Sequence, residues 1–337
     1  MPSVSIIIPC FNEQTTIRKL LEAIYAQTYP RADLEVVIAD GMSTDGTQAE
    51  ITAFADSHPD LQIVILDNLK RHIPAGLNCA LKAANGGIIV RLDAHSMPYP
   101  HYIERCVADL EAGLGENVGG VWEIRPGADS WVAQSVAVAA AHPFGVGDAL
   151  YRHAVKPALV DTVPFGAFKR EMLALVGFFD ETLLTNEDYE FNARIRKSGG
   201  RVWLDPSIRS VYFARPTLQG LAKQYFRYGF WKWRMLRRYP DTLRWRQALP
   251  PLFMLSLIGL GIMAIFLPVL RVLFAAEIIV YALALTAAGV QMAFKHKRFF
   301  LVLGLPLTIS CMHISWGTGF LSSMIKGVLS NHDPERK

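Results

Sequence analysis

The chain has 337 residues, of which 51% are hydrophobic and 19% charged, and its formal net charge is +4. The length suits one large domain or two smaller ones, and the apolar content is ample for a buried core. The four cysteines show neither metal-site spacing nor a C-x-x-C pair, which argues against a disulfide-stapled domain. A mean hydropathy of +0.23 is high for a soluble enzyme, so apolar segments are expected.

The N-terminal half alternates short apolar runs with amphipathic stretches. Strands are predicted at residues 4–8, 34–39, 61–66 and from 87, and helices at 12–27, after 47 and at 74–84. Alternation at this spacing predicts a parallel sheet with helices on both faces. Further along, a strand is predicted at 119–124, a helix at 131–141, a loop at 142–148 and a short strand at 160–165.

The strand that begins at Gly87 ends abruptly in Asp93, Ala94 and His95. Ligands of open α/β sheets lie beyond the carboxyl ends of such strands. Asp93 and His95 are two residues apart, so in an extended segment they point the same way and could share one ion. A carboxylate with an imidazole suits Mn²⁺, or Mg²⁺ with more waters. The alternative is an ordinary turn followed by an exposed histidine.

Asp40 repeats this pattern at the end of the second predicted strand, where it could accept hydrogen bonds from a nucleobase or ribose. The alternative for Asp40 and Asp45 is turn formation and helix capping. No G-x-G-x-x-G follows the first strand, and no G-x-x-x-x-G-K-[ST] occurs. These absences disfavour a dinucleotide-dependent oxidoreductase and a P-loop NTPase.

A second acidic segment begins at Asn186, which can cap a helix that carries Glu187 and Asp188 in its first turn. A purely structural helix start would look the same. The functional interpretation is that Asp188 or Glu187 is a general base. A helix N-terminus lowers a carboxyl pKa, so such a base would need apolar surroundings, which Phe178, Phe179 and Tyr189 could supply.

The C-terminal third contains three long intervals almost free of charge, which predict membrane segments near 249–270, 272–294 and 299–322. The third contains Pro306, so a kinked or re-entrant segment is the alternative. Three basic residues lie between the second and third segments but only Arg271 between the first two, so the N-terminal part should be cytoplasmic. The tail would then lie outside if all three segments span.

The stretch from Lys223 to Arg246 holds eight basic residues, one acid and several aromatic residues. This pattern predicts an amphipathic interfacial helix on anionic lipid. Nucleic acid is the alternative partner, and the neighbouring apolar segments disfavour it. Within this stretch, Arg227 near a metal could hold a diphosphate.

Taken together, these residues resemble the inverting family 2 glycosyltransferases, which have a GT-A fold. The resemblance covers roughly residues 3–230. Its ordered motifs are Asp40-Gly-Met-Ser-Thr-Asp-Gly-Thr, Gly76-Leu-Asn78 with Asn85-Gly-Gly87, Arg91-Leu-Asp93-Ala-His95, the approach from Gly166 to Glu187-Asp188, and Gln224-x-x-Arg227-Tyr228. Within the family, the segments at 142–147 and 160–166 and the apolar C-terminus are similar to the succinoglycan-type, ExoA-like membrane glucosyltransferases.

The resemblance implies a role for each position. Asp40 would contact uracil, Asp93 the ribose or metal, and His95 the metal. Asp188, beside Glu187, would be the base for the acceptor hydroxyl, and Gln224 with Arg227 would hold the diphosphate. The predicted nucleotide-sugar-binding set also contains Pro9, Asn12, Glu13, Arg71 and Asn78. The predicted acceptor set contains Asp161, Tyr228 and Trp231.

We therefore predict an α/β fold: a GT-A nucleotide-sugar-binding (Rossmann-like) domain with a mostly parallel sheet, followed by transmembrane helices. The predicted domains are a catalytic domain at 1–216, an interfacial region at 217–247, three membrane segments within 248–325 and a tail at 326–337.

The function implied by the resemblance is transfer of a sugar, glucose by family resemblance, from a UDP-sugar to a lipid-linked (polyprenyl diphosphate) saccharide. The product would be a β-glycosidic bond in exopolysaccharide biosynthesis, made with Mn²⁺ or Mg²⁺ at the cytoplasmic face of a bacterial inner membrane. Other polysaccharide-assembly proteins are allowed as partners, and nucleic acid is not expected. The alternatives are a processive polysaccharide synthase and a non-catalytic sugar-nucleotide-binding assembly subunit.

Overall fold

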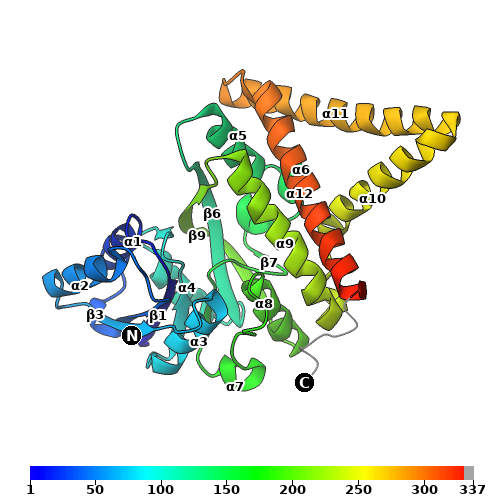
Figure 1. Ribbon diagram of the computed structural model, residues 1–337. Helices are drawn as coiled ribbons and strands as arrows, with labels where there is room; N and C mark the ends of the chain where they lie inside the picture. Colours follow the sequence, from blue (N-terminus) through cyan, green and yellow to red (C-terminus); the bar gives the residue numbers. More distant parts are fainter. Residues whose placement is uncertain (330–337) are drawn as a thin grey trace. The chain divides into compact units, whose positions relative to one another are not determined.

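The computed structural model describes residues 1–329, which form two compact units (Figure 1). The first unit comprises Met1–Glu123 and Leu150–Tyr212. The second comprises Ile124–Ala149 and the chain from Phe213 onward. The domain boundary near residue 216 stays a prediction, and residues 124–149 belong to the second unit.

Four parallel strands open the first unit: β1 (Val4–Cys10), β2 (Leu34–Asp40), β3 (Gln62–Asp67) and β4 (Ile88–Arg91). β1 pairs with β2 and with β4, and β2 pairs with β3. The helices between them are α1 (Ile17–Tyr25), α2 (Thr47–Ser57) and α3 (Ile73–Ala83). The predicted alternation of strands and helices is confirmed.

The later strands complete a mixed sheet. β8 (Ala167–Lys169) runs antiparallel to β4 and to β6 (Asn117–Pro126). β5 (Met97–Pro98) and β7 (Ala158–Leu159) run antiparallel to β9 (Val202–Ala214). Within residues 1–329, the sheet has nine strands in the order β3-β2-β1-β4-β8-β6-β9-β5, with β7 on β9. The predicted α/β class is confirmed, and the four N-terminal strands are its parallel part.

Three predicted boundaries are wrong for local backbone reasons. No strand forms at 160–165, because Pro164 has no backbone N–H and Phe165 adopts a left-handed φ of 61°. The loop predicted at 142–148 contains a short helix, α6 (Pro143–Val146). The helix predicted from residue 12 begins at Ile17, because Asn12 has a φ of 53° and its side chain accepts a hydrogen bond from the Thr44 backbone N–H at 2.8 Å.

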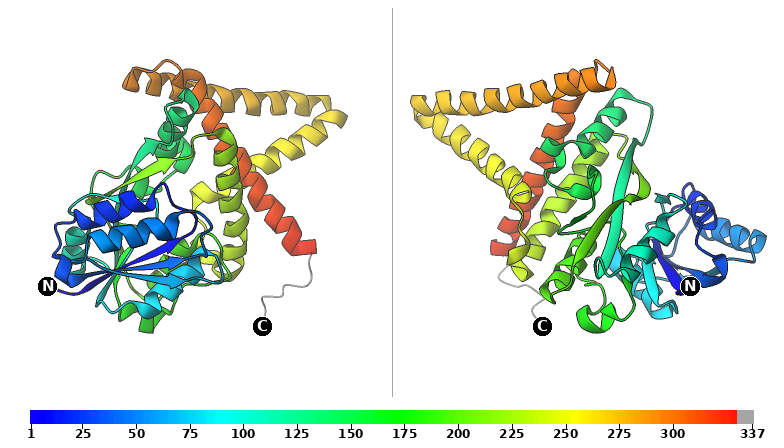
Figure 2. Two further views of the ribbon diagram at one scale, coloured as in Figure 1. Left: turned by 60° about the vertical axis from the view of Figure 1, so that its left-hand side comes forward. Right: turned by 180° about the vertical axis from the view of Figure 1, so that it is seen from behind.

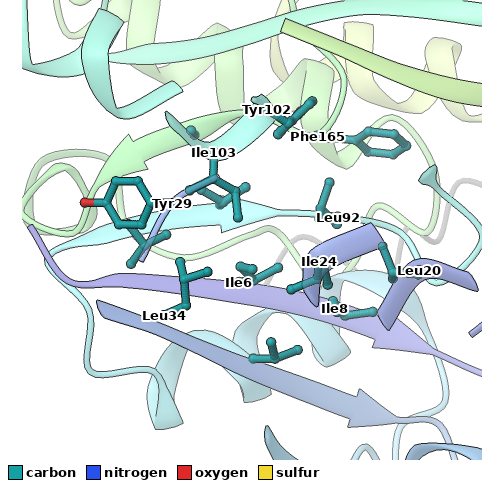
Figure 3. Packing of buried hydrophobic residues seen from close by; sticks show 14 of the residues in the cluster. Ile6, Ile8, Leu20, Ile24, Tyr29, Leu34, Leu92, Tyr102, Ile103 and Phe165 are labelled. Atoms are coloured by element: carbon teal, nitrogen blue, oxygen red, sulfur yellow. The ribbon is translucent and has the colours of Figure 1, made fainter. Parts of the chain in front are cut away.

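The buried side chains of β1 alternate between the two faces of the sheet. Ile6 and Ile8 pack with Leu20 and Ile24 of α1, as Figure 3 shows, and the same cluster includes residues of α4 (Tyr102–Glu111). Ile7 belongs to the cluster on the other face, with side chains of α3, α7 (Met172–Val176) and α8 (Glu187–Lys197). Successive side chains point to opposite faces, and both faces are covered by helices. The strands are therefore almost continuously apolar.

The second unit is helical, with α5 (Trp131–Ala141), α6, α9 (Leu218–Arg238), α10 (Trp245–Phe266), α11 (Pro268–His296) and α12 (Leu301–Leu329). Three helical segments are long and apolar enough to cross a membrane: Trp245–Phe266, Pro268–His296 and Leu301–Gly327. They coincide closely with the three predicted segments. In Figure 2, α9 and α12 lie side by side in both views, and α10 and α11 meet at Leu267. Pro306 lies inside the continuous helix α12.

The helix α9 has the predicted amphipathic character. Its buried residues recur every three or four positions, at Leu221, Tyr225, Gly229, Lys232 and Met235. The Lys232 Nζ donates to the Thr242 carbonyl at 3.0 Å, which satisfies a buried cation. Part of this helix is therefore covered by protein, and its contact with lipid stays a prediction.

A buried carboxylate fixes the start of the sheet. Glu35 is buried, and its Oε1 accepts from the Ser5 hydroxyl at 2.5 Å and from the Gly86 N–H at 3.1 Å. A Cβ at Gly86 would collide with the Ser5 backbone, so the Asn85-Gly86 turn has a structural purpose. Burial raises the pKa of Glu35, but the hydrogen bonds from Ser5, Asn85 and Gly86 outweigh burial and leave this pKa below its ordinary value.

We expect Glu35→Gln to lower the free energy of unfolding by about 1–3 kcal/mol at pH 7, because buried donors lose a charged acceptor. A carboxylate with a depressed folded pKa stabilises the fold above its unfolded pKa of about 4.3, and this contribution disappears as pH falls through the folded pKa. The melting-temperature gap between the variant and the parent, measured in detergent, should therefore narrow below about pH 4. The control is Glu22→Gln at an exposed ion pair, where little change is expected. A gap that is independent of pH would contradict this account.

Candidate active site

The loops that follow the parallel strands lie at one edge of the sheet. In the register, Asp40 pairs with Cys10 and with Asp67, and Arg91 pairs with Ile7. The carboxyl ends of β1, β2, β3 and β4 therefore face the same side, where a ligand of an open α/β sheet binds.

The buried Asp40 organises the turn after β2. Its carboxylate accepts from the Ser43 N–H at 2.9 Å, the Ser43 hydroxyl at 2.5 Å and the Gln48 amide at 2.6 Å. Asp45 accepts from the Thr47 N–H at 3.0 Å, and this threonine lowers the pKa of Asp45. Turn formation, the alternative considered from the sequence, thus accounts for both acids in the free protein, and the contact of Asp40 with uracil stays a prediction.

Left-handed backbone conformations at non-glycine residues gather in the first unit. Of the six such residues within 1–329, five lie in its loops: Asn12, Met42, Arg71, Phe165 and Asn186. Each of these conformations is strained for an L-residue and persists only where the surrounding structure imposes it. Three of them follow β1, β2 and β3, at the edge where the site was predicted.

Arg91 is the central residue of this edge, and the sequence reasoning did not single it out. Its side chain is buried on β4, and its Nη2 lies 3.1 Å from Asp93 Oδ1 and 2.8 Å from Glu187 Oε1. Its Nη1 donates to Asp188 Oδ1. Burial alone would lower the pKa of Arg91, but Asp93 and Glu187 raise it, so the guanidinium stays charged. A lone arginine in an otherwise apolar strand was the available signal.

The expected surroundings of Asp188 are therefore wrong. Apolar side chains were expected around it, yet a buried guanidinium holds it, Phe178 is exposed, and the Tyr189 hydroxyl donates to Asp161 at 2.8 Å. Asn186 occupies the cap position of α8 but makes no side-chain cap hydrogen bond, because its backbone is left-handed. A cation, rather than an apolar pocket, therefore pairs with the two acids at this helix start.

His95 and Asp93 follow β4 and have different partners, Glu13 and Arg91. The side chains are partly exposed, at 44% for His95 and 22% for Asp93, and the His95 Nδ1 lies 3.0 Å from Glu13 Oε1. Burial raises the pKa of Glu13, but hydrogen bonds from His95 and Thr16 outweigh it and lower this pKa overall. Within residues 1–329, no group of three or more His, Cys, Asp or Glu side chains could hold a metal. A carboxylate and an imidazole suit Mn²⁺ or Mg²⁺, provided that a bound ligand supplies the remaining oxygens.

The other predicted residues of the first unit have structural partners. The Asn78 amide donates to the Phe179 carbonyl and to Glu181, both at 2.9 Å, and accepts from the Phe179 N–H at 2.9 Å. Pro9 packs against Gly76 at the start of α3. Asn78 thus holds the segment that leads to α8, an indirect contribution to the site.

Four predicted residues lie on α9 in the second unit: Gln224, Arg227, Tyr228 and Trp231. The Gln224 amide donates to the Tyr228 hydroxyl at 2.9 Å, one helical turn away. Their roles toward the diphosphate and the acceptor stay predictions. Within the first unit, by contrast, the structure brings Asp93, Glu187 and Asp188 together around Arg91.

Residues 5–175, from β1 into α7, match the family described as glycosyl transferase family 2. The match covers half of the chain. The chain belongs to glycosyl transferase family 2. The predicted family and enzyme class are confirmed.

Two relatives within the family match nearly the whole chain. The dolichyl N-acetyl-alpha-D-glucosaminyl phosphate 3-beta-D-2,3-diacetamido-2,3-dideoxy-beta-D-glucuronosyltransferase of Methanococcus voltae is 29% identical, over 97% of this chain and 98% of that protein. The succinoglycan biosynthesis protein ExoA of Rhizobium meliloti is 29% identical, over 95% of this chain and 94% of that protein. The predicted closeness to ExoA-like proteins is thereby confirmed.

Among solved structures, the mannosyltransferase PcManGT of Pyrobaculum calidifontis, in complex with GDP-Man and Mn²⁺, superposes with a TM-score of 0.62 at 24% identity. The alignment covers 98% of this chain and 88% of that one. This likeness confirms the predicted GT-A-like fold.

For this family 2 enzyme we expect Arg91→Met to reduce the free energy of unfolding by about 3–5 kcal/mol, because three carboxyl groups lose their buried cation. Arg91→Lys keeps the charge but loses the fork that reaches several carboxylates, so its loss should be smaller. Thermal unfolding in detergent measures both, with Arg18→Met at an exposed pair as the control. A melting temperature unchanged by Arg91→Met would show that the cluster does not stabilise the fold.

Proposed function

We propose that this protein is a membrane-anchored inverting glycosyltransferase that moves a sugar, glucose in our proposal, from a UDP-sugar to a lipid-linked saccharide in exopolysaccharide biosynthesis. The observation that carries the proposal is the pairing of Asp93 and Glu187-Asp188 on one buried Arg91, at the carboxyl edge of the parallel strands. Arg91 thereby connects Asp93, the acid proposed to lie on the donor side, to Asp188, the candidate base. The name of one relative, a dolichyl phosphate saccharide transferase, supports a lipid-linked acceptor, and the name of the other, a succinoglycan biosynthesis protein, supports polysaccharide biosynthesis.

In the proposed reaction, the Asp188 carboxylate accepts the proton of the acceptor hydroxyl as that oxygen attacks the anomeric carbon. Arg91 fixes the orientation of the Asp188 carboxylate, because the guanidinium donates to Oδ1. The bond to the UDP oxygen breaks on the opposite face of the sugar. One displacement inverts the anomeric centre, so an α-linked donor gives a β-linked product.

Asp93 and His95 are the residues that would hold a divalent cation, together with the diphosphate of the donor. When bound, such a cation supplies charge neutralisation of the leaving diphosphate. Gln224 and Arg227 are proposed to bind that diphosphate too. Asp40, with Pro9, Asn12, Glu13, Arg71 and Asn78, is proposed to form the nucleotide-sugar pocket, and Asp161, Tyr228 and Trp231 the acceptor side.

We place the catalytic unit at the cytoplasmic face of a bacterial inner membrane. The apolar helices of the second unit anchor it there, and the positive-inside rule supports this orientation. Because a lipid-linked acceptor is confined to the bilayer, anchoring raises its effective concentration at the site.

The function is tested by UDP release from detergent-solubilised protein that is offered a panel of UDP-sugars with Mn²⁺ and purified lipid-linked saccharides. We expect release with one sugar, at a rate at least 10²-fold lower for Asp188→Asn because the amide cannot accept the proton. Asp205→Asn, at an acid on β9, is the control and should leave the rate unchanged.

Three outcomes would argue against parts of this proposal. A polymeric product would favour a processive synthase, and an α-linked product in NMR spectra would contradict inversion. UDP binding without release for any donor and acceptor would favour the non-catalytic assembly subunit.

Metal binding should depend on the nucleotide, because Asp93 and His95 are too few ligands to hold Mn²⁺ alone. In calorimetry we expect weak Mn²⁺ binding to the free protein and at least 10-fold tighter UDP binding when Mn²⁺ is present. His95→Ala should remove most of this coupling, whereas His101→Ala, an exposed histidine, should not. Tight Mn²⁺ binding without UDP would contradict the assignment.

A further inference from the structure

The helix α12 differs from α10 and α11 although all three are long and apolar enough to cross a membrane. In its most apolar stretch, 39% of α12 is buried inside the protein, against 17% for α10 and 6% for α11. A helix that crosses a bilayer beside only two other helices exposes most of its surface to lipid, as α11 does. The burial of α12 therefore points to a different environment.

The helix α9 covers the C-terminal half of α12. Small residues let the two backbones touch: a Cβ at Gly229 would collide with the Trp316 carbonyl, and one at Gly319 with the Phe226 carbonyl. The Cys311 Sγ lies 3.6 Å from the Leu218 carbonyl, which marks the N-terminal end of this contact. The rings of Trp233 and Phe320 pack edge to face at 5.3 Å. The contact thus follows α9 from its first residue to its last turns.

The N-terminal half of α12 is covered by α5 and α6. A Cβ at Gly304 would collide with the Ser135 side chain of α5. The His313 Nε2 lies 2.7 Å from the Phe144 carbonyl of α6, so a hydrogen bond ties α12 to this short helix. Leu301, Leu305 and Ile309 are fully buried in this region.

The charge of α9 opposes insertion of α12. The helix α9 has six basic residues and no acidic one: Lys223, Arg227, Lys232, Arg234, Arg237 and Arg238. If α12 crossed the bilayer, α9 would be carried into the hydrocarbon with it, and charged side chains at that depth are strongly disfavoured.

The exposed side of α12 is one narrow apolar stripe. Its exposed large apolar residues are Leu303, Leu307, Ile314 and Ile325, which follow one another at spacings of about one, two and three helical turns. These positions fall on one face of a helix. Because protein covers the other sides of α12, only this stripe is available for contact with lipid, as it is in a helix that lies in the plane of a membrane interface.

The two ends of the α10–α11 hairpin carry basic residues, whereas its tip has only Arg271 near Leu267. Arg246, at the start of α10, pairs with Asp148, and Arg298, after α11, donates to Gln134 of α5. Both ends of the hairpin are thereby attached to the same segment, Ile124–Ala149. The positive-inside rule places both ends on one side.

We infer that only the α10–α11 hairpin enters the hydrocarbon, that α12 lies with α9 at the interface, and that the C-terminus stays on the same side as the catalytic unit. The partner of the α12 stripe is the headgroup and acyl-chain boundary of the bilayer. This topology replaces the expectation that all three apolar segments span with the tail outside. It does not depend on the reaction that the enzyme catalyses.

The depth of α12 is the first test. Ile314, in the middle of α12, and Leu283, in the middle of α11, are exposed positions for a fluorophore attached to an introduced cysteine, with Cys79 and Cys311 replaced by serine. The probe is a vesicle of phosphatidylcholine and phosphatidylglycerol, brominated either near the headgroup or near the chain end. We expect the Leu283→Cys label to be quenched best from the chain end and the Ile314→Cys label best from near the headgroup. Equal depth of both labels at the bilayer centre would overturn the inference.

The side of the C-terminus is the second test, on the full chain with one epitope tag at each terminus. We expect protease to remove both tags in inverted membrane vesicles and neither in spheroplasts. Tags on opposite sides of the membrane would overturn the inference. Both tags removed only in spheroplasts would support the shared side and contradict the cytoplasmic orientation of the proposed function.

Discussion

A single buried guanidinium holds the candidate active site together. Arg91 extends from the central strand β4 to Asp93, which follows the same strand, and to Glu187 and Asp188, which begin α8. Removing such a cation from water is costly, and only well-placed carboxylates repay that cost. The position of α8 against the sheet therefore depends on this charge, and so does the orientation of the candidate base. The ion pairs of Arg91 therefore serve both the stability of the fold and the proposed chemistry.

The rest of the edge is organised by hydrogen bonds within the protein. Asp40 closes the turn after β2, and Asn78 ties α3 to the segment before α8. Strained left-handed residues follow three of the parallel strands. These hydrogen bonds shape the edge without a ligand, and such pre-organisation lowers the entropic cost of binding and of aligning reactants. Residues that a family motif marks as ligand-binding can thus first serve to shape the pocket.

In the second unit, hydropathy alone does not distinguish the helices that enter the hydrocarbon from a helix at the interface. Charge and burial together make this distinction. Each Arg or Lys at the centre of a bilayer costs about 2.5–3.5 kcal/mol on insertion scales. The helix α9 carries six such residues and packs closely on α12, so insertion of α12 would bring them toward the hydrocarbon. The α10–α11 hairpin has far fewer charged residues, since only Arg271 and Glu277 lie between the basic residues at its ends. A partly buried apolar helix at the surface would keep the catalytic unit against the lipid.

The sequence by itself determined the alternation of strands and helices, the acids at the ends of β2 and β4 and the three apolar segments. All of these follow from local periodicity and charge, which neighbouring residues encode. Only the tertiary structure decided that Arg91 pairs with Glu187 and Asp188, 96 and 97 residues away, and that α9 and α5 cover α12. No local pattern contains those contacts, because they depend on how β8, α8 and the later helices pack. The surroundings expected for Asp188 were wrong for this reason: a distant cation took the place of nearby apolar side chains.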